Sequence, residues 1–224
     1  MAAAPLEPPA SPIDLVIFDC DGVLVDSEPL ALRVCVELGA ELGWALTERE
    51  IVDRFLGRSE RAVRAQIAER LGESAAAVWG EQYRLRLAEI IDAELTEVAG
   101  ISEALAAITI PHCIASSGGH DKMRRTLTRT GLYDRFAGRV FSASEVAHGK
   151  PAPDLFLHAA ERMGVAPARC VVVEDSQYGV QAARAAGMRS FGYAGGLTPA
   201  DWLAGPDTVV FDDMRKLPVL LGLL

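Results

Sequence analysis

Residues 13–22 read Ile-Asp-Leu-Val-Ile-Phe-Asp-Cys-Asp-Gly, and this stretch decides the fold. Its first six residues are mostly apolar and β-branched, and an acidic, glycine-containing cluster follows them. A short apolar run bounded in this way predicts a buried strand that ends at Asp19. The carboxyl end of that strand therefore carries two aspartates, Asp19 and Asp21.

Similar apolar runs recur along the chain, and helical patterns separate them. The runs lie at residues 111–115, 170–173, 188–193 and 208–211, and the clearest helical patterns at residues 122–130, 154–163 and 178–186. Strands that alternate with helices predict parallel βαβ units in a doubly wound, Rossmann-like sheet of the α/β class. Ligands of such sheets bind at the carboxyl ends of the strands.

The stretch between the first two predicted strands is different, because residues 29–92 show helical periodicity and no strand signal. A purely helical insertion directly after the first strand is most simply a small cap domain over the active end of the sheet. We therefore expect a flexible N-terminal tail at residues 1–12, a helical cap at residues 27–93, and a discontinuous catalytic core of residues 13–26 and 94–224.

Composition excludes several classes of protein. The chain has 224 residues, with 22 Lys and Arg against 31 Asp and Glu, a net charge of −9. This excess of acid argues against nucleic acid or an anionic membrane as the main partner. No apolar run approaches the ~18 residues of a membrane span. The start of the chain lacks a signal peptide, and the four cysteines form no CxxC pair, so we expect a cytoplasmic protein. The apolar segment 217–224 could dock on the core or meet a second subunit, so we expect a monomer or a homodimer.

Polar residues follow each of three predicted strands. Asp19 and Asp21 follow the first strand, Ser116, Ser117 and Gly118 the second, and Glu174 and Asp175 a later one, while Lys150 lies in a loop before the helix at 154–163. Four acidic residues that converge on one edge of a sheet repel one another, and burying them is costly. A lysine and a divalent cation remove that cost. Carboxylate oxygens suit Mg²⁺.

Such a group of residues suits phosphoryl transfer. A carboxylate can attack phosphorus to form an aspartyl-phosphate while a second carboxylate handles protons. Lys150, Mg²⁺ and the amides and hydroxyls of the loop at 116–118 would bind the phosphoryl group. Taken one at a time these signals are common: a D-x-D is often a turn, and Asp175-Ser176 could cap the following helix. Their joint order along the chain points to a site.

The chain resembles the haloacid dehalogenase superfamily. Residues 18–28, Phe-Asp-Cys-Asp-Gly-Val-Leu-Val-Asp-Ser-Glu, resemble its first signature, and Ser116, Lys150-Pro151 and Glu174-Asp175-Ser176 resemble the other three. The resemblance implies that Asp19 is the nucleophile and Asp21 the acid and base. It also implies that Ser116 and Lys150 bind the phosphoryl group. Mg²⁺ would be held by Asp19, the backbone carbonyl of Asp21 and Asp175, with Glu174 beside it or as an alternate ligand.

The same resemblance separates the branches of the superfamily. Asp21 argues against dehalogenation, because true dehalogenases lack the second aspartate, and the absence of lysine between residues 29 and 121 argues against phosphonatase chemistry. β-Phosphoglucomutases carry Lys-Gly and Lys-Asn where this chain has Leu56-Gly57 and Gly118-Gly119. The nearest resemblance is to sugar-phosphate phosphatases, including the 6-phosphogluconate type.

These observations predict a Mg²⁺-dependent phosphatase that acts on a small phosphorylated metabolite, and they favour a sugar phosphate. A β-phosphoglucomutase-like intramolecular phosphotransferase is the alternative, and a non-catalytic protein that binds a phosphorylated metabolite is a third reading. In the cap, Glu28, Arg58 and Ser59 are the candidates for contact with the substrate, although Arg58 and Ser59 also fit ordinary surface residues at a helix start.

Overall fold

The computed structural model describes residues 12–58 and 60–223. Within these residues the core is a six-stranded parallel sheet in the order β3-β2-β1-β4-β5-β6. Its strands are β1 (Leu15–Phe18), β2 (His112–Ser116), β3 (Val140–Ser142), β4 (Cys170–Glu174), β5 (Arg189–Tyr193) and β6 (Thr208–Phe211). The predicted α/β class with a doubly wound sheet is confirmed.

The first predicted strand, β1, lies at the centre of the sheet. Val16 pairs with His112 of β2 on one side and with Val171 of β4 on the other. All four residues of β1 are buried. A continuous apolar run is what a parallel strand needs when helices cover both faces of its sheet.

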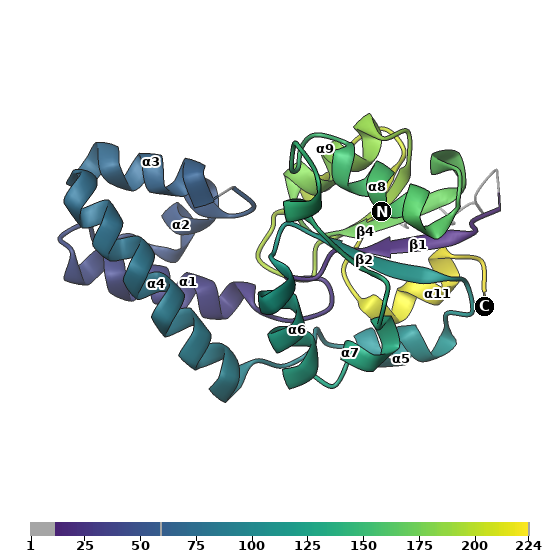
Figure 1. The fold of residues 1–224 in the computed structure, drawn as a ribbon, viewed down its shortest axis with the longest axis horizontal. Coiled ribbons are helices and arrows are strands. Elements are labelled where there is room, and N and C mark those ends of the chain that lie inside the picture. The colour runs from purple at the N-terminus through teal and green to yellow at the C-terminus, as the bar shows by residue number, and fades with distance from the viewer. Residues whose placement is uncertain (1–11, 59, 224) are drawn as a thin grey trace, which may run out of the picture.

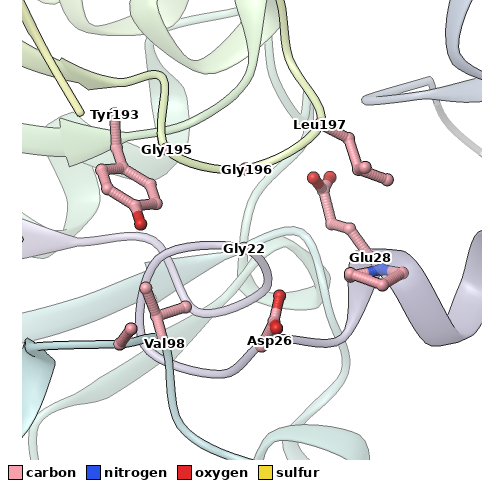
Figure 2. A pocket seen from close by; sticks show the side chains of 10 residues that line it. Gly22, Asp26, Glu28, Val98, Tyr193, Gly195, Gly196 and Leu197 are labelled. Atoms are coloured by element: carbon pink, nitrogen blue, oxygen red, sulfur yellow. The ribbon is translucent and has the colours of Figure 1, made fainter. Parts of the chain in front are cut away.

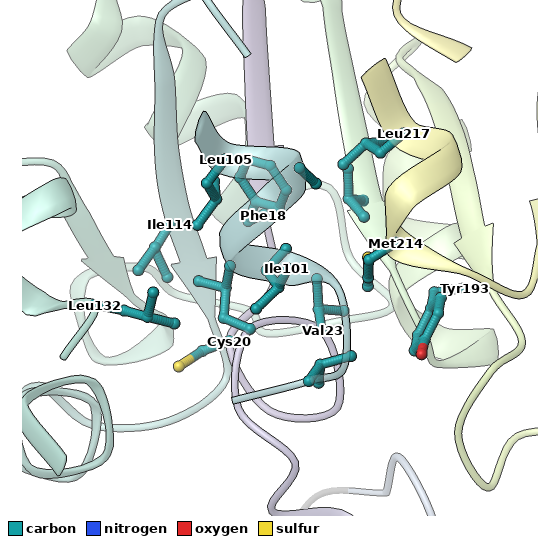
Figure 3. Close-up of a cluster of buried hydrophobic side chains, with 14 of the residues drawn as sticks. Phe18, Cys20, Val23, Ile101, Leu105, Ile114, Leu132, Tyr193, Met214 and Leu217 are labelled. Atoms are coloured by element: carbon teal, nitrogen blue, oxygen red, sulfur yellow. The ribbon is translucent and has the colours of Figure 1, made fainter. Parts of the chain in front are cut away.

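Helices cover the sheet on both faces (Figure 1). Val16 and Phe18 of β1 face a cluster formed with α5 (Ile101–Ala107), α6 (His120–Arg129), α7 (Tyr133–Phe136) and α11 (Leu217–Leu220). Leu15 and Ile17 face the other cluster, formed with α8 (Asp154–Met163) and α9 (Gln177–Ala185). Figure 3 shows Phe18 among Ile101, Leu105 and Leu217 in the first cluster. Alternate residues of one strand thus build two cores.

Short elements complete the core. They are α10 (Ala200–Leu203) and the 3₁₀ turns η1 (Ala143–Glu145), η2 (Pro167–Arg169) and η3 (Met214–Lys216). All four cysteines, Cys20, Cys35, Cys113 and Cys170, are buried thiols without a disulfide. None of the helices in the described part of the chain has both the length and the hydropathy to cross a membrane.

The remaining helices form a separate unit beside the sheet (Figure 1). They are α1 (Glu28–Glu41), α2 (Glu48–Phe55), α3 (Glu60–Leu71) and α4 (Glu73–Glu94). This helical unit has its own hydrophobic cluster, in which Trp79 contacts Phe55 and Trp44 edge-on or tilted at ring-centroid distances of 6.2 and 6.5 Å. The aromatic residues of the unit therefore pack against one another.

Two short linkers join the helical unit to the core, and they run side by side. Asp26 N donates to Thr96 O at 3.0 Å, and Val98 N donates to Leu24 O at 3.0 Å. An isolated antiparallel bridge also pairs Val25 with Glu97. Both chain crossings between core and helical unit are thus held at one place, next to the end of β1.

A glycine substitution tests the packing of the helical unit. Gly39 of α1 is buried, and an added Cβ would lie 2.5 Å from the carbonyl oxygen of Trp44. We expect Gly39→Ala to destabilise the protein by about 1–3 kcal/mol through overpacking, although alanine has the higher helix propensity. The free energy of unfolding in urea is the measurement.

The matched control is Gly80→Ala. Gly80 lies on the exposed face of α4, and an added Cβ would meet no atom within 4 Å. This variant should be as stable as the parent or more stable by up to ~1 kcal/mol. If Gly39→Ala were as stable as Gly80→Ala, the close contact between α1 and the Trp44 backbone would be wrong.

Candidate active site

The polar residues predicted to converge lie at the carboxyl ends of three neighbouring strands. Asp19 follows β1, Ser116 ends β2, and Glu174 ends β4, with Asp175 directly after it. All four side chains are buried. Because β2, β1 and β4 are adjacent and parallel, their carboxyl ends bring these residues to one edge of the sheet.

Lys150 joins two of the carboxylates. Its Nζ lies 2.5 Å from Asp19 Oδ1 and 2.5 Å from Glu174 Oε1, and it stands 4.9 Å from the ring centroid of Phe156. Burial alone would lower the pKa of Lys150, but the charges of Asp19 and Glu174 outweigh it and raise that pKa. The ammonium group therefore stays charged between two carboxylates.

The environment of Asp19 opposes its ionisation. Burial raises the pKa of Asp19 to about 7, and the neighbouring charges of Glu174 and Asp21 act in the same direction, whereas Lys150 lowers it. The Asp19 carboxylate therefore depends on a neighbouring cation, here Lys150, to stay ionised at the edge of the sheet.

Glu174 is held in place by the start of α9. The backbone N and the Oγ of Ser176 donate to Glu174 Oε2 at 2.7 and 2.9 Å. Ser176 Oγ also accepts from Gly179 N at 3.0 Å, so Ser176 caps α9, not Asp175. A Cβ on Gly179 would lie 1.8 Å from the Glu174 carboxyl carbon, so only glycine leaves room for this carboxylate.

Asp21 has a different set of partners. Ser27 Oγ donates to Asp21 Oδ1 at 2.7 Å, and Lys122 Nζ donates to Asp21 Oδ2 at 2.7 Å. Burial would raise the pKa of Asp21, but the charge of Lys122 and these hydrogen bonds hold it below the ordinary carboxyl value.

Neither Ser27 nor Lys122 was expected to touch the site from the sequence. Ser27 precedes α1 in the position of an N-cap, but its side chain bonds to Asp21 and makes no cap hydrogen bond. Lys122 lies in the first turn of α6, directly after the loop that follows β2. Because β2 ends at the same edge of the sheet as β1, a lysine in the first turn of the helix after β2 lies near that edge. This position is the signal that could have identified Lys122.

The loop after β2 presents one buried hydroxyl. Ser116 Oγ accepts from Gly118 N at 3.1 Å, and Ser142 Oγ donates to Gly118 O at 2.8 Å, so the loop is tied to β3. Ser117 lies exposed on the outside of this turn. Of the three predicted loop residues, Ser116 and Gly118 are therefore fixed by hydrogen bonds, whereas the Ser117 side chain is open to solvent.

Two buried carboxylate oxygens near the site, Asp175 Oδ2 and Glu28 Oε2, have no donor from any other group. The two carboxyl groups contact each other, so a hydrogen bond between them forms only when one of them is protonated. Burial, with the charges of Glu28, Glu174 and Asp19, raises the pKa of Asp175 well above its ordinary value. Burial likewise raises the pKa of Glu28 to about 8. Gly22 lets Asp175 approach the chain, because a Cβ there would lie 2.1 Å from Asp175 Oδ2.

This donor set fits a hard divalent cation. The carboxylates of Asp19, Asp21, Glu28, Glu174 and Asp175 lie close enough for their charges to raise the pKa values of Asp19, Glu28 and Asp175. Among the described residues, the ammonium groups of Lys122 and Lys150 offset their charge. Among residues 12–58 and 60–223 no three His, Cys, Asp or Glu side chains are grouped so as to hold a metal by themselves. Asp19 and Glu174 are hydrogen-bonded to Lys150, and Asp21 is hydrogen-bonded to Lys122, so these carboxylates point toward the lysines and not toward one common point. Mg²⁺ needs only one or two carboxylates, with water and phosphate oxygens for the rest.

A cavity of about 110 Å³ adjoins these residues. Its wall includes Gly22, the linker residue Asp26, Glu28 at the start of α1, and Gly195 and Gly196 of the loop after β5. Figure 2 shows the Glu28 carboxylate directed toward Gly196 and Leu197. Glu28 therefore lies where the linker, the end of β1 and the loop after β5 meet.

The loop between α2 and α3 touches the core close to the site. A Cβ on Gly57 would lie 3.2 Å from Ser176 Cβ and 3.3 Å from the ring of Tyr178. Arg58, the next residue, is exposed on the same loop. Ser59, the other residue expected in this loop, lies outside the described residues.

Comparison with known proteins matches residues 13–187 to the family of haloacid dehalogenase-like hydrolases. The 6-phosphogluconate phosphatase of Escherichia coli is 33% identical over 211 residues, which are 94% of this chain and 95% of that protein. The phosphorylated carbohydrates phosphatase of Thermotoga maritima is 33% identical over 183 residues, 79% of this chain and 82% of that protein.

A solved structure is similar over the whole fold. A conserved haloacid dehalogenase-like protein of Agrobacterium tumefaciens superimposes with a TM-score of 0.85 at 37% sequence identity. The match covers 94% of this chain and 98% of the other. The similarity thus extends over both the sheet and the helical unit.

The space that Gly179 leaves for Glu174 can be tested. We expect Gly179→Ala to displace the Glu174 carboxylate from Lys150 and to lower kcat/KM for hydrolysis of 4-nitrophenyl phosphate by about 10- to 100-fold, since small misplacements in a site are costly. Steady-state rates of purified protein are the measurement. Gly149→Ala is the control, because an added Cβ there, next to Lys150, meets only Ala143 Cβ at 3.9 Å. Equal rates for the two variants would contradict the role given to Gly179.

Proposed function

Because the chain belongs to the haloacid dehalogenase-like hydrolases and is a phosphoric monoester hydrolase, we propose that it is a magnesium-dependent phosphatase of a small phosphorylated metabolite. The observation that carries the proposal is the buried Asp19 carboxylate at the end of β1, paired with Lys150 and two residues before Asp21. The names of the relatives support a sugar phosphate as substrate.

In the proposed reaction, Asp19 is the nucleophile. Its carboxylate oxygen attacks phosphorus, an O–P bond forms to Asp19, and the bond from phosphorus to the metabolite's oxygen breaks. Asp21 is ionised in the free site, so in this proposal it first takes a proton from solvent when the negatively charged phosphate binds. It then gives that proton to the departing oxygen, so that the metabolite leaves as an alcohol. Asp21 then takes a proton from water, whose oxygen attacks the phosphorus of the aspartyl-phosphate. The bond between the Asp19 oxygen and phosphorus breaks, so inorganic phosphate leaves and the Asp19 carboxylate is restored.

Lys150 and the loop after β2 bind the phosphoryl group in this proposal. Lys150 offsets the charge on Asp19, and the Ser116 hydroxyl and the Ser117 amide donate to phosphoryl oxygens. The Gly118 amide, which donates to Ser116 Oγ, orients that hydroxyl. The tie between Gly118 and Ser142 supports the idea that this loop is held ready for an anion.

The proposed magnesium ligands are the carboxylates of Asp19 and Asp175 and the backbone carbonyl of Asp21, with Glu174 beside them. The unpartnered, buried Asp175 Oδ2 supports this assignment. Mg²⁺ would offset the negative charge of the carboxylates and of the phosphoryl oxygens.

We propose that the helical unit of α1–α4, with residues 27–93 as its bounds, is a cap that closes over the site and excludes water. The contact of the Gly57 loop with Ser176 and Tyr178 supports this. Glu28 and Arg58 would then face the part of the metabolite that leaves. The 6-phosphogluconate phosphatase relative favours a phosphorylated sugar or sugar acid for that part.

The proposed function is tested by phosphate release from a panel of phosphorylated sugars, sugar acids, polyols and nucleotides. We expect release with Mg²⁺, loss of release with EDTA, and recovery when Mg²⁺ is added back. Asp19→Asn should lower the rate by at least about 10³-fold, since the nucleophile is lost. Asp14→Asn, at the other end of β1 and paired with Arg169, should keep the parent rate. Release by Asp19→Asn at the parent rate would rule out the covalent route.

The same panel separates hydrolysis from the mutase alternative. With β-glucose 1-phosphate and a bisphosphate primer we expect phosphate release to exceed glucose 6-phosphate formation. The reverse order would identify an intramolecular phosphotransferase. Tight binding of a panel compound without turnover and without Mg²⁺ dependence would instead identify a binding protein.

A further inference from the structure

Lys122 is a charged residue at the site that none of the roles above uses. It extends from the first turn of α6, and its Nζ donates to Asp21 Oδ2 at 2.7 Å. Its stem crosses the loop after β2, because a Cβ on Gly118 would lie 3.6 Å from Lys122 Cδ and 3.5 Å from Ser116 Oγ. Lys122 therefore lies between the proposed phosphate-binding loop and the carboxylate proposed to transfer protons.

Two donors hold the Asp21 carboxylate, one on each oxygen. Ser27 Oγ binds Oδ1 from the first linker, and Lys122 Nζ binds Oδ2 from the core. A single donor leaves a carboxylate free to turn about its terminal torsion, which is broad in aspartate. Two donors from different directions fix both the position and the plane of the group.

Stability does not account for this ion pair. The Lys122 and Asp21 side chains are 41% and 26% exposed, and pairs open to solvent contribute little to the free energy of unfolding. Ordering a lysine side chain also costs conformational entropy. The main effect of the ion pair is therefore on the position of the Asp21 carboxylate and not on the stability of the fold.

We propose that Lys122 is a positioning residue for Asp21. Its ammonium group fixes the Asp21 carboxylate beside the Ser116 loop, where the oxygen that leaves the phosphoryl group would receive its proton. This inference rests on the proposed phosphatase function. It differs from the role of Lys150, which contacts Asp19 and Glu174.

A positioning role and a binding role predict different kinetics. A lysine that binds the substrate itself would raise KM when it is removed. A lysine that acts through Asp21 would lower kcat and leave KM nearly unchanged. Its removal would also cost little more in a protein that already lacks the Asp21 carboxylate, because effects carried through one shared group are not additive.

The test uses Lys122→Met, which keeps the stem and removes the charge, with 6-phosphogluconate and 4-nitrophenyl phosphate as substrates. We expect kcat to fall by about 10- to 100-fold, within the range that general acid–base catalysis contributes, with KM changed less than about threefold. The midpoint of thermal unfolding should stay near that of the parent, because the pair is partly open to solvent. Lys122→Arg should restore part of kcat, and it carries the test if the Met variant does not fold.

The matched control is Lys216→Met. Lys216 Nζ also pairs with an aspartate, Asp212, at 2.5 Å, and that pair is exposed and follows the edge strand β6. This variant should keep the parent kcat and KM. In an Asp21→Asn background, Lys122→Met should lower the residual rate on 4-nitrophenyl phosphate by less than about twofold.

Three results would overturn the inference while the proposed function stands. They are an active parent protein with an unchanged Lys122→Met variant, a rise in KM at constant kcat, and an undiminished loss in the Asp21→Asn background. A parent protein that releases no phosphate from any substrate would overturn the proposed function, and the inference with it.

Discussion

A buried ammonium group between two carboxylates is the interaction on which the rest of the site depends. Lys150 Nζ lies 2.5 Å from both Asp19 and Glu174, whose strands β1 and β4 are neighbours. Removing one partner would leave a buried charge without compensation, which is far more costly than the loss of an exposed pair. Other features follow from this requirement: Ser176 donates twice to Glu174, and Gly179 leaves room for it.

The carboxylates of the site fall into two groups according to their partners. Asp19, Asp21 and Glu174 have donors on other residues, whereas one buried oxygen each of Asp175 and Glu28 has no donor other than a proton shared between these two carboxyl groups. A buried oxygen without a donor is costly in a folded protein unless something binds it. The unpaired oxygens and the excess of negative charge have a common physical remedy in a divalent cation, which is why the proposal of a magnesium-dependent reaction agrees with the electrostatics of the described residues.

Asp21 connects the two parts of the molecule. Its carboxylate is bound by Ser27, in the linker that leads to the helical unit, and by Lys122, in a helix of the core. The linkers themselves are hydrogen-bonded to each other, and the Gly57 loop of the helical unit touches Ser176 and Tyr178. A movement of the helical unit relative to the sheet would therefore act on the linker and, through Ser27, on the position of the residue proposed to transfer protons.

The sequence by itself determined the α/β class, the family and the set of acidic residues at the strand ends. Apolar runs such as residues 13–18 are local patterns, and the carboxyl ends of parallel strands always share one edge of a sheet. The family resemblance also implied that Lys150 offsets the charge around Asp19. Only the tertiary structure decided that Lys150 also binds Glu174, that Lys122 and Ser27 bond to Asp21, and that Glu174 requires Gly179. Lys122 and Asp21 are 101 positions apart, and Lys150 and Asp19 are 131 apart. No spacing in the chain encodes such contacts, because they depend on how strands, loops and helix starts pack together in space.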